Sequence, residues 1–276
     1  MKFAGVVVWY NPDSKSKENI DSYLKYLDRL YIVDNSNYKN EVPKSKKILY
    51  LPNMDNLGIA EALNIGVRNA IDEGYNWLLT MDQDSSFSGN DLLELEKYIE
   101  NKTIENIGIV SPWHKTKLHK EKPREDVDYP LDVMTSGNLV NLGILKKIGE
   151  FKSEYFIDGV DMEYCLRLNK NGYKIARLNY IELNHNLGNI FYKKVFNKEM
   201  LCLNHNYLRV YYKVRNYRYI KKEYGNLYPE FCNKIVKTKA LIWCIIFYEK
   251  DKFRKLRSII FANRDFKKGI MGKYNH

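Results

Sequence analysis

The sequence predicts an α/β fold built on a largely parallel sheet. Apolar, β-rich runs recur at residues 3–10, 31–33, 48–51 and 77–79. An amphipathic helical pattern over residues 17–30 separates the first two runs, and a second one begins near residue 59. The first run lacks the alternation of a half-exposed strand, as expected for a strand covered on both faces. Strands that alternate with helices form βαβ units, and a chain of 276 residues that is 45% hydrophobic can bury such a core.

Polar groups follow three of these strands directly. Tyr10-Asn11 closes the first strand, Asp34-Asn35-Ser36 the second, and Asp82-Gln83-Asp84 the fourth, while Pro52 stops the third. In open α/β sheets, ligands bind beyond the carboxyl ends of the strands. We therefore expect these groups to meet at one edge of the sheet.

The segment from Asn56 to Gly66 has two interpretations. Gly58 stands at a loop-to-helix junction, where a glycine lets the backbone approach a ligand and helix N–H groups favour anions. The recurrence of Ile59, Leu63 and Val67 equally fits an ordinary helix start, and no dinucleotide or Walker pattern is present.

Asp82 and Asp84 form the most informative pair. If both belong to a strand, their side chains project to the same side, and a cation between them allows both to stay ionised. Oxygen ligands at a strand end suit Mg²⁺ or Mn²⁺. The alternative is an Asp-rich turn in which one of them caps a helix.

Residues 92–163 continue the α/β pattern. A helix at 92–99, a strand at 107–110, a charged surface loop at 114–130 and a small-residue turn into a strand at 134–140 are predicted. An acidic cluster with Asp158, Asp161 and Glu163 then leads into a helix. Acidic residues near a helix N-terminus also have a plain explanation as dipole-favoured caps.

The positive charge is concentrated at the C-terminal end. Residues 1–200 contain 27 Lys and Arg against 29 Asp and Glu, whereas residues 201–276 contain 18 against 5. The sequence thus predicts a near-neutral domain over 1–200 and a basic, aromatic-rich helical region over 201–276. This distribution disfavours a nucleic-acid-binding protein, which remains the alternative from another functional class.

Two features of the sequence are typical of a cytosolic protein. Its four cysteines are scattered without a Cys-x-x-Cys spacing, which suits a reducing compartment. We find no secretory signal, and the longest apolar run, at 240–248, is too short to span a bilayer.

The motifs together resemble a family 2 glycosyltransferase of the GT-A fold, most closely its rhamnosyltransferase branch. The similarity covers residues 3 to about 220. It is carried by the segments 8–12, 33–36, 56–60, 81–85, 136–137, 149–151, 156–158, 160–167 and 184–188. The resemblance implies a mixed sheet flanked by helices, and a metal-dependent, inverting transfer of a sugar from a nucleotide diphosphate.

The family pattern also implies roles for individual residues. The donor nucleotide would be bound by Tyr10, Asn11, Asp34, Asn56, Gly58 and Asp82. A divalent metal, Mn²⁺ or Mg²⁺, would be held by Asp82, Asp84 and His185, with Asp84 the more direct ligand. A structural histidine is the alternative for His185.

On the acceptor side of the site, the family pattern implies one carboxylate that acts as general base. Asp161 matches the general base of the family, with Glu163 as the second candidate and Asp158 as a weaker one. Many relatives have a Glu-Asp pair before this helix, where this chain has Val160-Asp161. Arg167 would either orient the acidic turn by an ion pair or lie on a solvated helix face.

The basic region has several possible partners. Basic-aromatic interleaving over 205–219 fits a helix that packs on the catalytic domain, and also single-stranded nucleic acid. Residues 240–261 combine an apolar-aromatic face with cations, which suits an anionic membrane surface, a second subunit or the core.

The resulting expectation is a cytoplasmic enzyme, peripheral at the inner face of the plasma membrane, that acts in bacterial surface polysaccharide synthesis. The first-choice donor is dTDP-rhamnose and the second a UDP-hexose, with a saccharide acceptor that is possibly lipid-linked. No nucleic-acid partner is expected, and a homodimer is compatible with the sequence. A nucleotidyltransferase is the rival enzyme class, but the basic, glycine-rich N-terminal signature expected of one is lacking.

Overall fold

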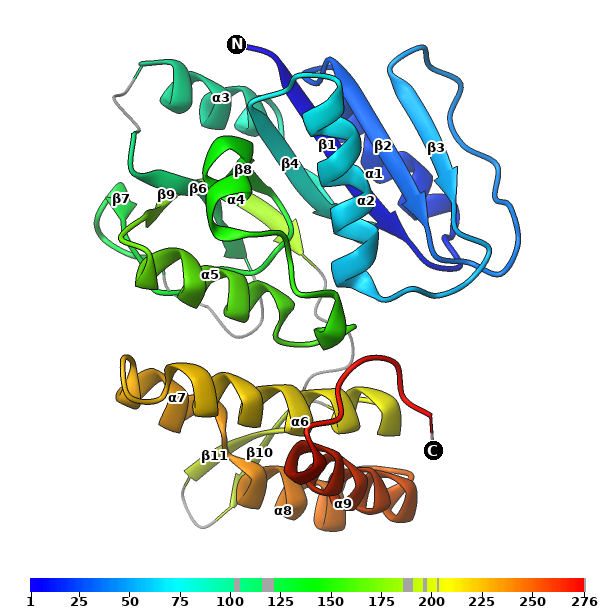
Figure 1. Cartoon of the computed structure of the whole chain (residues 1–276), viewed down its shortest axis with the longest axis vertical. Coiled ribbons are helices and arrows are strands. Elements are labelled where there is room, and N and C mark those ends of the chain that lie inside the picture. The colour runs from blue at the N-terminus through cyan, green and yellow to red at the C-terminus, as the bar shows by residue number, and fades with distance from the viewer. Residues whose placement is uncertain (102–104, 116–121, 186–190, 196–197, 203, 276) are drawn as a thin grey trace. The chain divides into compact units, whose positions relative to one another are not determined.

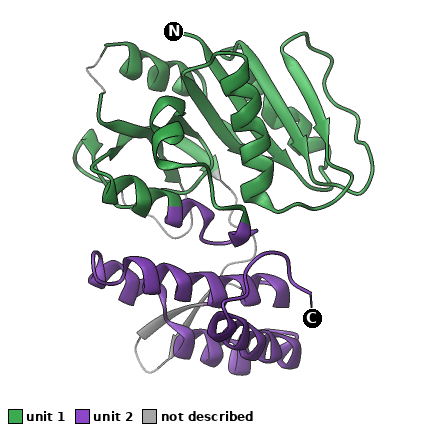
Figure 2. Ribbon diagram, viewed as in Figure 1, with its two compact units in different colours: residues 1–153, 164–186 green, residues 154–163, 187–276 purple. Residues whose placement is uncertain are grey.

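The computed structural model describes residues 1–101, 105–115, 122–185, 191–195, 198–202 and 204–275; for 185, 191–195 and 198–201 it describes the backbone alone. The chain forms two compact units (Figure 2). Unit 1 comprises residues 1–153 and 164–186, and unit 2 comprises residues 154–163 and 187–276. The second unit therefore takes in a short internal segment as well as the C-terminal helices that the sequence predicted as a separate region.

Unit 1 alternates strands and helices through most of its length (Figure 1). Its first half contains β1 (Phe3–Trp9), α1 (Ser14–Leu24), β2 (Arg29–Asp34), β3 (Ile48–Pro52), α2 (Ile59–Asp72), β4 (Trp77–Asp82), β5 (Ser85–Phe87) and α3 (Asp91–Asn101). Its second half contains β6 (Ile107–Lys115), β7 (Val127–Asp128), β8 (Asn138–Asn141), α4 (Leu142–Ile148), most of α5 (Val160–Lys170) and β9 (Lys174–His185). The predicted helix over 17–30 is wrong in its extent, because Leu27 and Leu30 are buried core residues of the following turn and strand.

The sheet of unit 1 is mixed. Its strand order is β3-β2-β1-β4-β8-β6-β9-β5, and β7 pairs with β9. The β3-β2-β1-β4 part is parallel, as the sequence predicts, but β8 runs antiparallel to both β4 and β6. The residue pattern alone missed this reversal because β8 follows a loop, and nothing in the strand's own composition records its direction.

The register aligns the carboxyl ends of the parallel strands. Trp9 lies opposite Asp34, Asp34 lies opposite Pro52, and Val8 lies opposite Asp82. The polar residues that follow β1, β2 and β4 therefore emerge at one edge, as expected from the order of strands and helices.

Helices cover both faces of this sheet. On one face, α1 and α3 bury Ile20, Leu92 and Leu95 against strand residues that include Val7 and Leu79. On the other face α2 packs so closely that a Cβ on Gly66 would lie 2.3 Å from Val6 Cγ2. Glycine at position 66 is thus required by the close approach of helix and strand.

Unit 2 is mainly helical. It contains the antiparallel pair β10 (Phe191–Val195) and β11 (Lys198–Cys202), followed by α6 (Tyr207–Tyr224), α7 (Pro229–Ile235), α8 (Thr238–Tyr248) and α9 (Lys252–Lys268). Its core forms where α6, α8 and α9 contribute Val210, Tyr211, Ile245 and Ile259. The predicted aromatic helix over 205–219 thus packs within this unit, and the region 240–261 divides into two helices at residues 249–251.

Candidate functional site

Asp82 and Asp84 stand at a turn. β4 ends at Asp82, residues 83 and 84 form the turn, and β5 begins at Ser85. The argument that both side chains project alike from one strand is therefore wrong, because the strand ends between them. Asp82 is half-buried and Asp84 is exposed at the edge where the parallel strands end.

The residue between the two aspartates connects this turn to β1. The Tyr10 N–H donates to Gln83 Oε1 at 2.8 Å, and Asn19 Nδ2 on α1 donates to the Gln83 carbonyl at 2.9 Å. The Asn11 N–H donates to Ser36 Oγ at 2.7 Å, which joins the β1 and β2 ends. Side-chain hydrogen bonds therefore hold three predicted parts of the donor site together.

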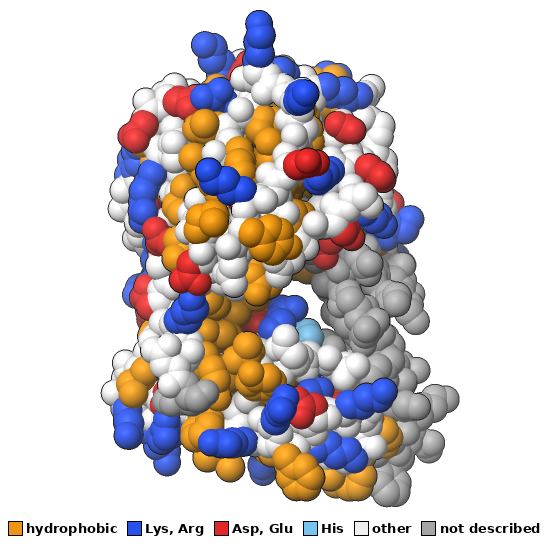
Figure 3. All heavy atoms as spheres, turned by 90° about the vertical axis from the view of Figure 1, so that its right-hand side faces the viewer, with side chains coloured by type: hydrophobic (Ala, Val, Ile, Leu, Met, Phe, Trp, Pro, Cys, Tyr) orange, Lys and Arg blue, Asp and Glu red, His pale blue; other side chains and the backbone are white. Residues whose placement is uncertain are grey.

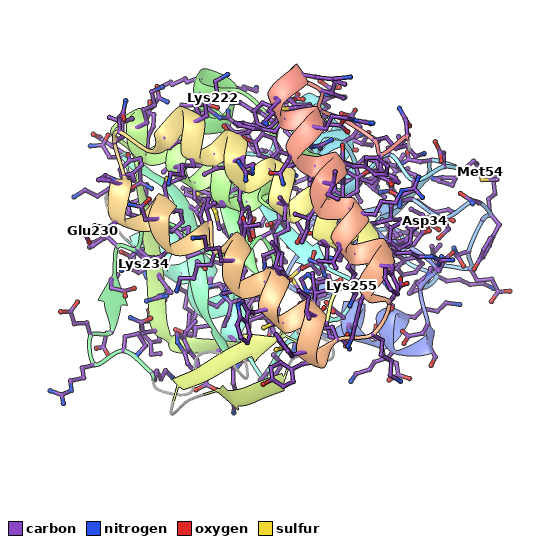
Figure 4. The ribbon with its side chains drawn as sticks, turned by 90° about the horizontal axis from the view of Figure 1, so that it is seen from below. Asp34, Met54, Lys222, Glu230, Lys234 and Lys255 are labelled. Atoms are coloured by element: carbon purple, nitrogen blue, oxygen red, sulfur yellow. The ribbon has the colours of Figure 1, made fainter. Side chains whose placement is uncertain are left out.

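Asp34 is buried within its own loop. Its carboxylate accepts hydrogen bonds from the Ser36 N–H at 2.9 Å, from Asn40 Nδ2 at 2.8 Å and from the Tyr50 hydroxyl at 2.8 Å. These contacts fix the loop that follows β2; Figure 4 labels Asp34 together with Met54 of the neighbouring loop after β3. A carboxylate with three donors shapes this loop whether or not it also contacts a nucleotide.

Asn56 and Gly58 form the approach to α2. The Asn56 side-chain oxygen accepts from the Gly58 N–H at 3.0 Å, and Asn35 Nδ2 donates to the Gly58 carbonyl at 3.0 Å. Gly58 has φ +84°, a left-handed value that favours glycine. The β2 end and the start of α2 are thus one hydrogen-bonded structure.

Sequence reasoning missed two residues that hold the end of β4. Ser136 Oγ accepts from the Asp82 N–H at 3.0 Å, and a ring nitrogen of the buried His114 lies 2.6 Å from the Ser136 carbonyl. The Ser136-Gly137 pair was noted as a motif, but only the pairing of β8 with β4 places it beside Asp82.

The donor set fits a divalent cation. Strand pairing places the backbone of His185, at the end of β9, opposite Ser85, next to Asp84. The His185 side chain lies outside the described residues, and among the described ones no three His, Cys, Asp or Glu side chains form a metal-binding group. Carboxylate and imidazole groups, the side-chain types of Asp82, Asp84 and His185, are ligands that Mn²⁺ accepts.

The turn at residues 156–159, directly before α5 and Asp161, belongs to unit 2. It follows a short 3₁₀ turn (Ser153–Tyr155) and adopts left-handed backbone at Phe156, Asp158 and Gly159, with φ values of +63°, +60° and +88°. Such conformations persist where the surroundings fix them. The structure must therefore hold this turn from outside.

Asn216 of α6 supplies that support. Its Nδ2 lies 2.8–2.9 Å from the carbonyl oxygens of Tyr155, Ile157 and Asp158, and the side chain is fully buried. Arg209, two turns earlier on α6, forms a bidentate ion pair with Asp158 at 2.6 and 3.1 Å. One helix, more than fifty residues further along the chain, thus fixes the turn before Asp161.

The surroundings of Asp161 raise its pKa. Burial is the largest cause and the neighbouring Asp158 adds to it, while a hydrogen bond from the Met162 N–H and the Arg209 charge act against them. A carboxylate with a raised pKa is a better proton acceptor, as a general base requires.

Glu163 and Arg167 have structural contacts. Glu163 is fully buried and its Oε1 accepts from the Tyr224 hydroxyl at 2.8 Å, both within unit 2. Arg167 donates to the carbonyls of Ile148, Gly149 and Glu150 at 2.7–2.8 Å and so holds the turn after α4. The structure therefore places Glu163 as an anchor between α5 and α6.

Comparison with known proteins identifies the family. Residues 6–152 match the protein family described as Glycosyl transferase family 2. The chain is 27% identical over 293 residues to the dTDP-rhamnosyl transferase RfbF of Shigella flexneri, a match that covers 98% of this chain and 97% of that protein.

Solved structures show the same fold. The fragment 1–349 of TarS from S. aureus, in complex with UDP-GlcNAc, has a TM-score of 0.60 at 16% identity and covers 98% of this chain and 82% of its own. GalNAc-T7 with UDP, GalNAc and Mn²⁺ has a TM-score of 0.54 at 14% identity, over 67% of this chain and 43% of that one. The fold is the GT-A type implied by the sequence, and the chain belongs to glycosyltransferase family 2.

Proposed function

We propose that this glycosyltransferase moves rhamnose from dTDP-rhamnose to a saccharide acceptor with inversion at the anomeric carbon. The observation that carries the donor assignment is the similarity to a dTDP-rhamnosyl transferase over nearly the full length of both chains. A UDP-hexose is the alternative donor, since UDP-GlcNAc is bound by a protein of the same fold.

The strand-end edge of unit 1 is the proposed donor site. Tyr10, Asn11 and Asp34 would bind the base and its sugar, with Asn56 and Gly58 lining the same edge. Asp82, Asp84 and His185 would hold the divalent metal. When bound, the metal offsets the charge of the diphosphate and stabilises it as a leaving group.

Asp161 is the proposed general base. It accepts the proton of the acceptor hydroxyl as that oxygen forms a bond to the anomeric carbon. The bond from this carbon to the β-phosphate oxygen breaks, and its electron pair leaves with the nucleoside diphosphate. Inversion needs no carboxylate nucleophile, so Asp161 is the single carboxylate required on the acceptor side.

The proposed setting is surface polysaccharide assembly on the cytoplasmic side of the membrane, with a lipid-linked saccharide as the acceptor. The described helices include none that is long and apolar enough to cross a bilayer. The proposal is supported by the exposed apolar and basic side chains of α8 and α9, considered in the next section.

A thermal-shift experiment tests the donor site. Melting temperatures are measured for the wild type with dTDP, UDP and their sugar conjugates, with and without Mn²⁺. A ligand that binds the native state raises the melting temperature by mass action. We expect Mn²⁺-dependent stabilisation by the dTDP series, its loss in Asp84→Ala, and its retention in Asp72→Ala, which removes an exposed carboxylate at the end of α2. Equal stabilisation of both variants would contradict the metal assignment, and stabilisation by UDP compounds alone would select the alternative donor.

A further inference from the structure

Helices α8 and α9 expose large apolar side chains. On α8 the exposed fractions are 49% for Trp243 and 55% for Phe247, whose rings lie 4.6 Å apart, and Ile246 is exposed beside them. On α9, Phe253 is 90% exposed and Ile260 is 66% exposed. Spacings of three, four and seven residues place each set on one face of its helix. A soluble surface rarely gathers five such side chains on two adjoining helices.

The two helices lie side by side in unit 2, and their opposite faces form its core. Ile245 of α8 and Ile259 of α9 pack inward with residues of α6. Figures 1 and 4 both show α8 beside α9, with Lys255 labelled near the start of α9. The exposed residues are therefore additional to the faces that stabilise the fold.

Cations surround the exposed apolar side chains. Around these side chains, on α8, on α9 and between them, the exposed cations include Lys239, Lys250, Lys252, Arg254, Arg257 and Arg264, and Lys267 and Lys268 at the end of α9 are exposed as well. Asp251 is the one exposed acidic residue in the same stretch, 238–268. Figure 3 shows Lys and Arg side chains interspersed with hydrophobic ones on the part of unit 2 that faces the viewer. We call the exposed sides of α8 and α9, with Trp243, Ile246, Phe247, Phe253, Ile260 and the first six of these cations, the basic apolar face.

Lys255 does not belong to this face. Its ammonium pairs with Glu249 at 2.8 Å, and both side chains are almost completely buried. This buried ion pair connects the end of α8 to the start of α9. Lys255 therefore has a structural role and is not one of the cations available to a partner.

The positive charge of the basic apolar face favours an anionic partner over a second copy of the chain. Two copies of the chain would bring its cations together with few exposed carboxylates to neutralise them, and lysine is depleted in protein interfaces. An anionic lipid surface supplies the complementary charge, while aromatic and aliphatic side chains enter the headgroup region between the cations. Phe253, between Lys252 and Arg254, has the arrangement of a membrane-inserting side chain.

We infer that the basic apolar face of α8 and α9 binds the surface of an anionic phospholipid bilayer. The inference extends the proposed function, in which the acceptor is lipid-linked, but it does not depend on it, because lipid binding requires neither donor nor acceptor.

Vesicle sedimentation tests the inference directly. The full chain is mixed with phosphatidylcholine vesicles that contain either no anionic lipid or about one third phosphatidylglycerol. We expect binding to the anionic vesicles, weakened at high salt because the Debye length shortens. The variant Lys252→Gln/Arg254→Gln/Arg257→Gln should lose more than tenfold in partitioning, since each surface cation contributes severalfold. The variant Phe253→Ser should also weaken it.

A matched control isolates the face from total charge. Lys39→Gln, Lys44→Gln and Lys46→Gln together remove three exposed cations from unit 1 and should leave partitioning unchanged. Equal loss in this control, or no binding to anionic vesicles, would overturn the inference. So would a concentration-dependent dimer in sedimentation equilibrium that Phe253→Ser dissociates, because the face would then bind a second copy. Nucleotide-induced stabilisation, measured on the same variants, reports separately on the donor site.

Discussion

The donor edge of unit 1 and the Asp161 turn of unit 2 are held in different ways. At the donor edge, strand register places Trp9 opposite Asp34 and Val8 opposite Asp82, and side-chain hydrogen bonds complete the structure. The Asp161 turn depends on Asn216 and Arg209, which the chain supplies from a helix that starts at Tyr207. A site built on strand ends is fixed by the sheet itself, whereas a strained turn needs a distant partner.

This difference has a consequence for function. The hydrogen bonds described above for the donor edge join residues of unit 1 to one another, and we expect the proposed donor site to tolerate changes in unit 2. Proton transfer at Asp161 should be sensitive to α6, although no residue of α6 is proposed to contact the reacting atoms. Nucleotide binding and turnover can therefore be separated by mutation.

The largest effect is expected from Asp161→Asn. A general base typically contributes 10²- to 10⁴-fold, so the transfer rate should fall by about a thousandfold while nucleotide-induced stabilisation is unchanged. Glu163→Gln is the matched control: it keeps an acceptor for the Tyr224 hydroxyl, and its rate should stay within about tenfold of wild type. The rates are measured under single-turnover conditions. If Glu163→Gln lowered the transfer rate more than Asp161→Asn, Glu163 would be the base instead.

Asn216→Ala should disturb the turn without removing the base. The carbonyls of Ile157 and Asp158 lose a hydrogen bond from Asn216, and the Tyr155 carbonyl keeps the one from the Ile157 N–H; we expect this to cost about 2–4 kcal/mol in free energy of unfolding. Turnover should fall more than tenfold, with KM for the donor nearly unchanged. Urea unfolding and steady-state kinetics measure both effects.

Asn263→Ala provides the comparison for this variant. Asn263 donates to one helix carbonyl, that of Ile259, and its removal should change both quantities little. If Asn216→Ala raised KM for the donor as strongly as it lowered kcat, the two regions would not be separable.

Glu96→Gln should stabilise unit 1 at alkaline pH. Glu96 on α3 is buried, and burial together with Glu100 and Asp28 raises its pKa from 4.5 to about 7. The folded state then binds more protons than the unfolded state between these values, so stability is lost as pH rises through this window. Glutamine has no proton to lose, and the gain above pH 7 should be of order 1–3 kcal/mol.

Urea unfolding at pH 5 and pH 8 checks this prediction. The gain should be much larger at pH 8 than at pH 5, because the folded state keeps the Glu96 proton until about pH 7. Glu94→Gln, which changes a half-exposed residue of the same helix, should show neither gain nor pH dependence of this kind. Equal stabilisation at both pH values would point to packing and not to the titration of Glu96.

The smallest effects concern the pH dependence of turnover. Activity that requires ionised Asp161 falls at low pH. Because Asp158 raises the pKa of Asp161 and Arg209 lowers it, Asp158→Asn should move the acidic limb to lower pH and Arg209→Gln should move it to higher pH. A pH–rate profile for each variant measures the shifts. If the acidic limb moved in the same direction in both variants, the substitutions would act through the shape of the turn and not through charge.

The sequence by itself determined most of the parallel part of the sheet in unit 1. Apolar runs, the residues that stop them and the βαβ order predict where β1, β2 and β4 end, because local composition fixes a buried strand and parallel pairing brings its carboxyl end to a common edge. The resemblance to family 2 glycosyltransferases predicted roles for the residues at that edge. The family itself is confirmed.

The tertiary structure decided what depends on contacts between distant segments. The sequence shows Asn216 as one polar residue in a basic helix, and Lys255 as one cation among several neighbouring ones. Only folding buries Asn216 against the turn before Asp161 and Lys255 against Glu249. A polar side chain acquires such a role from the carbonyl or carboxylate that meets it in the folded chain, and that partner lies too far along the sequence for any local pattern to identify it.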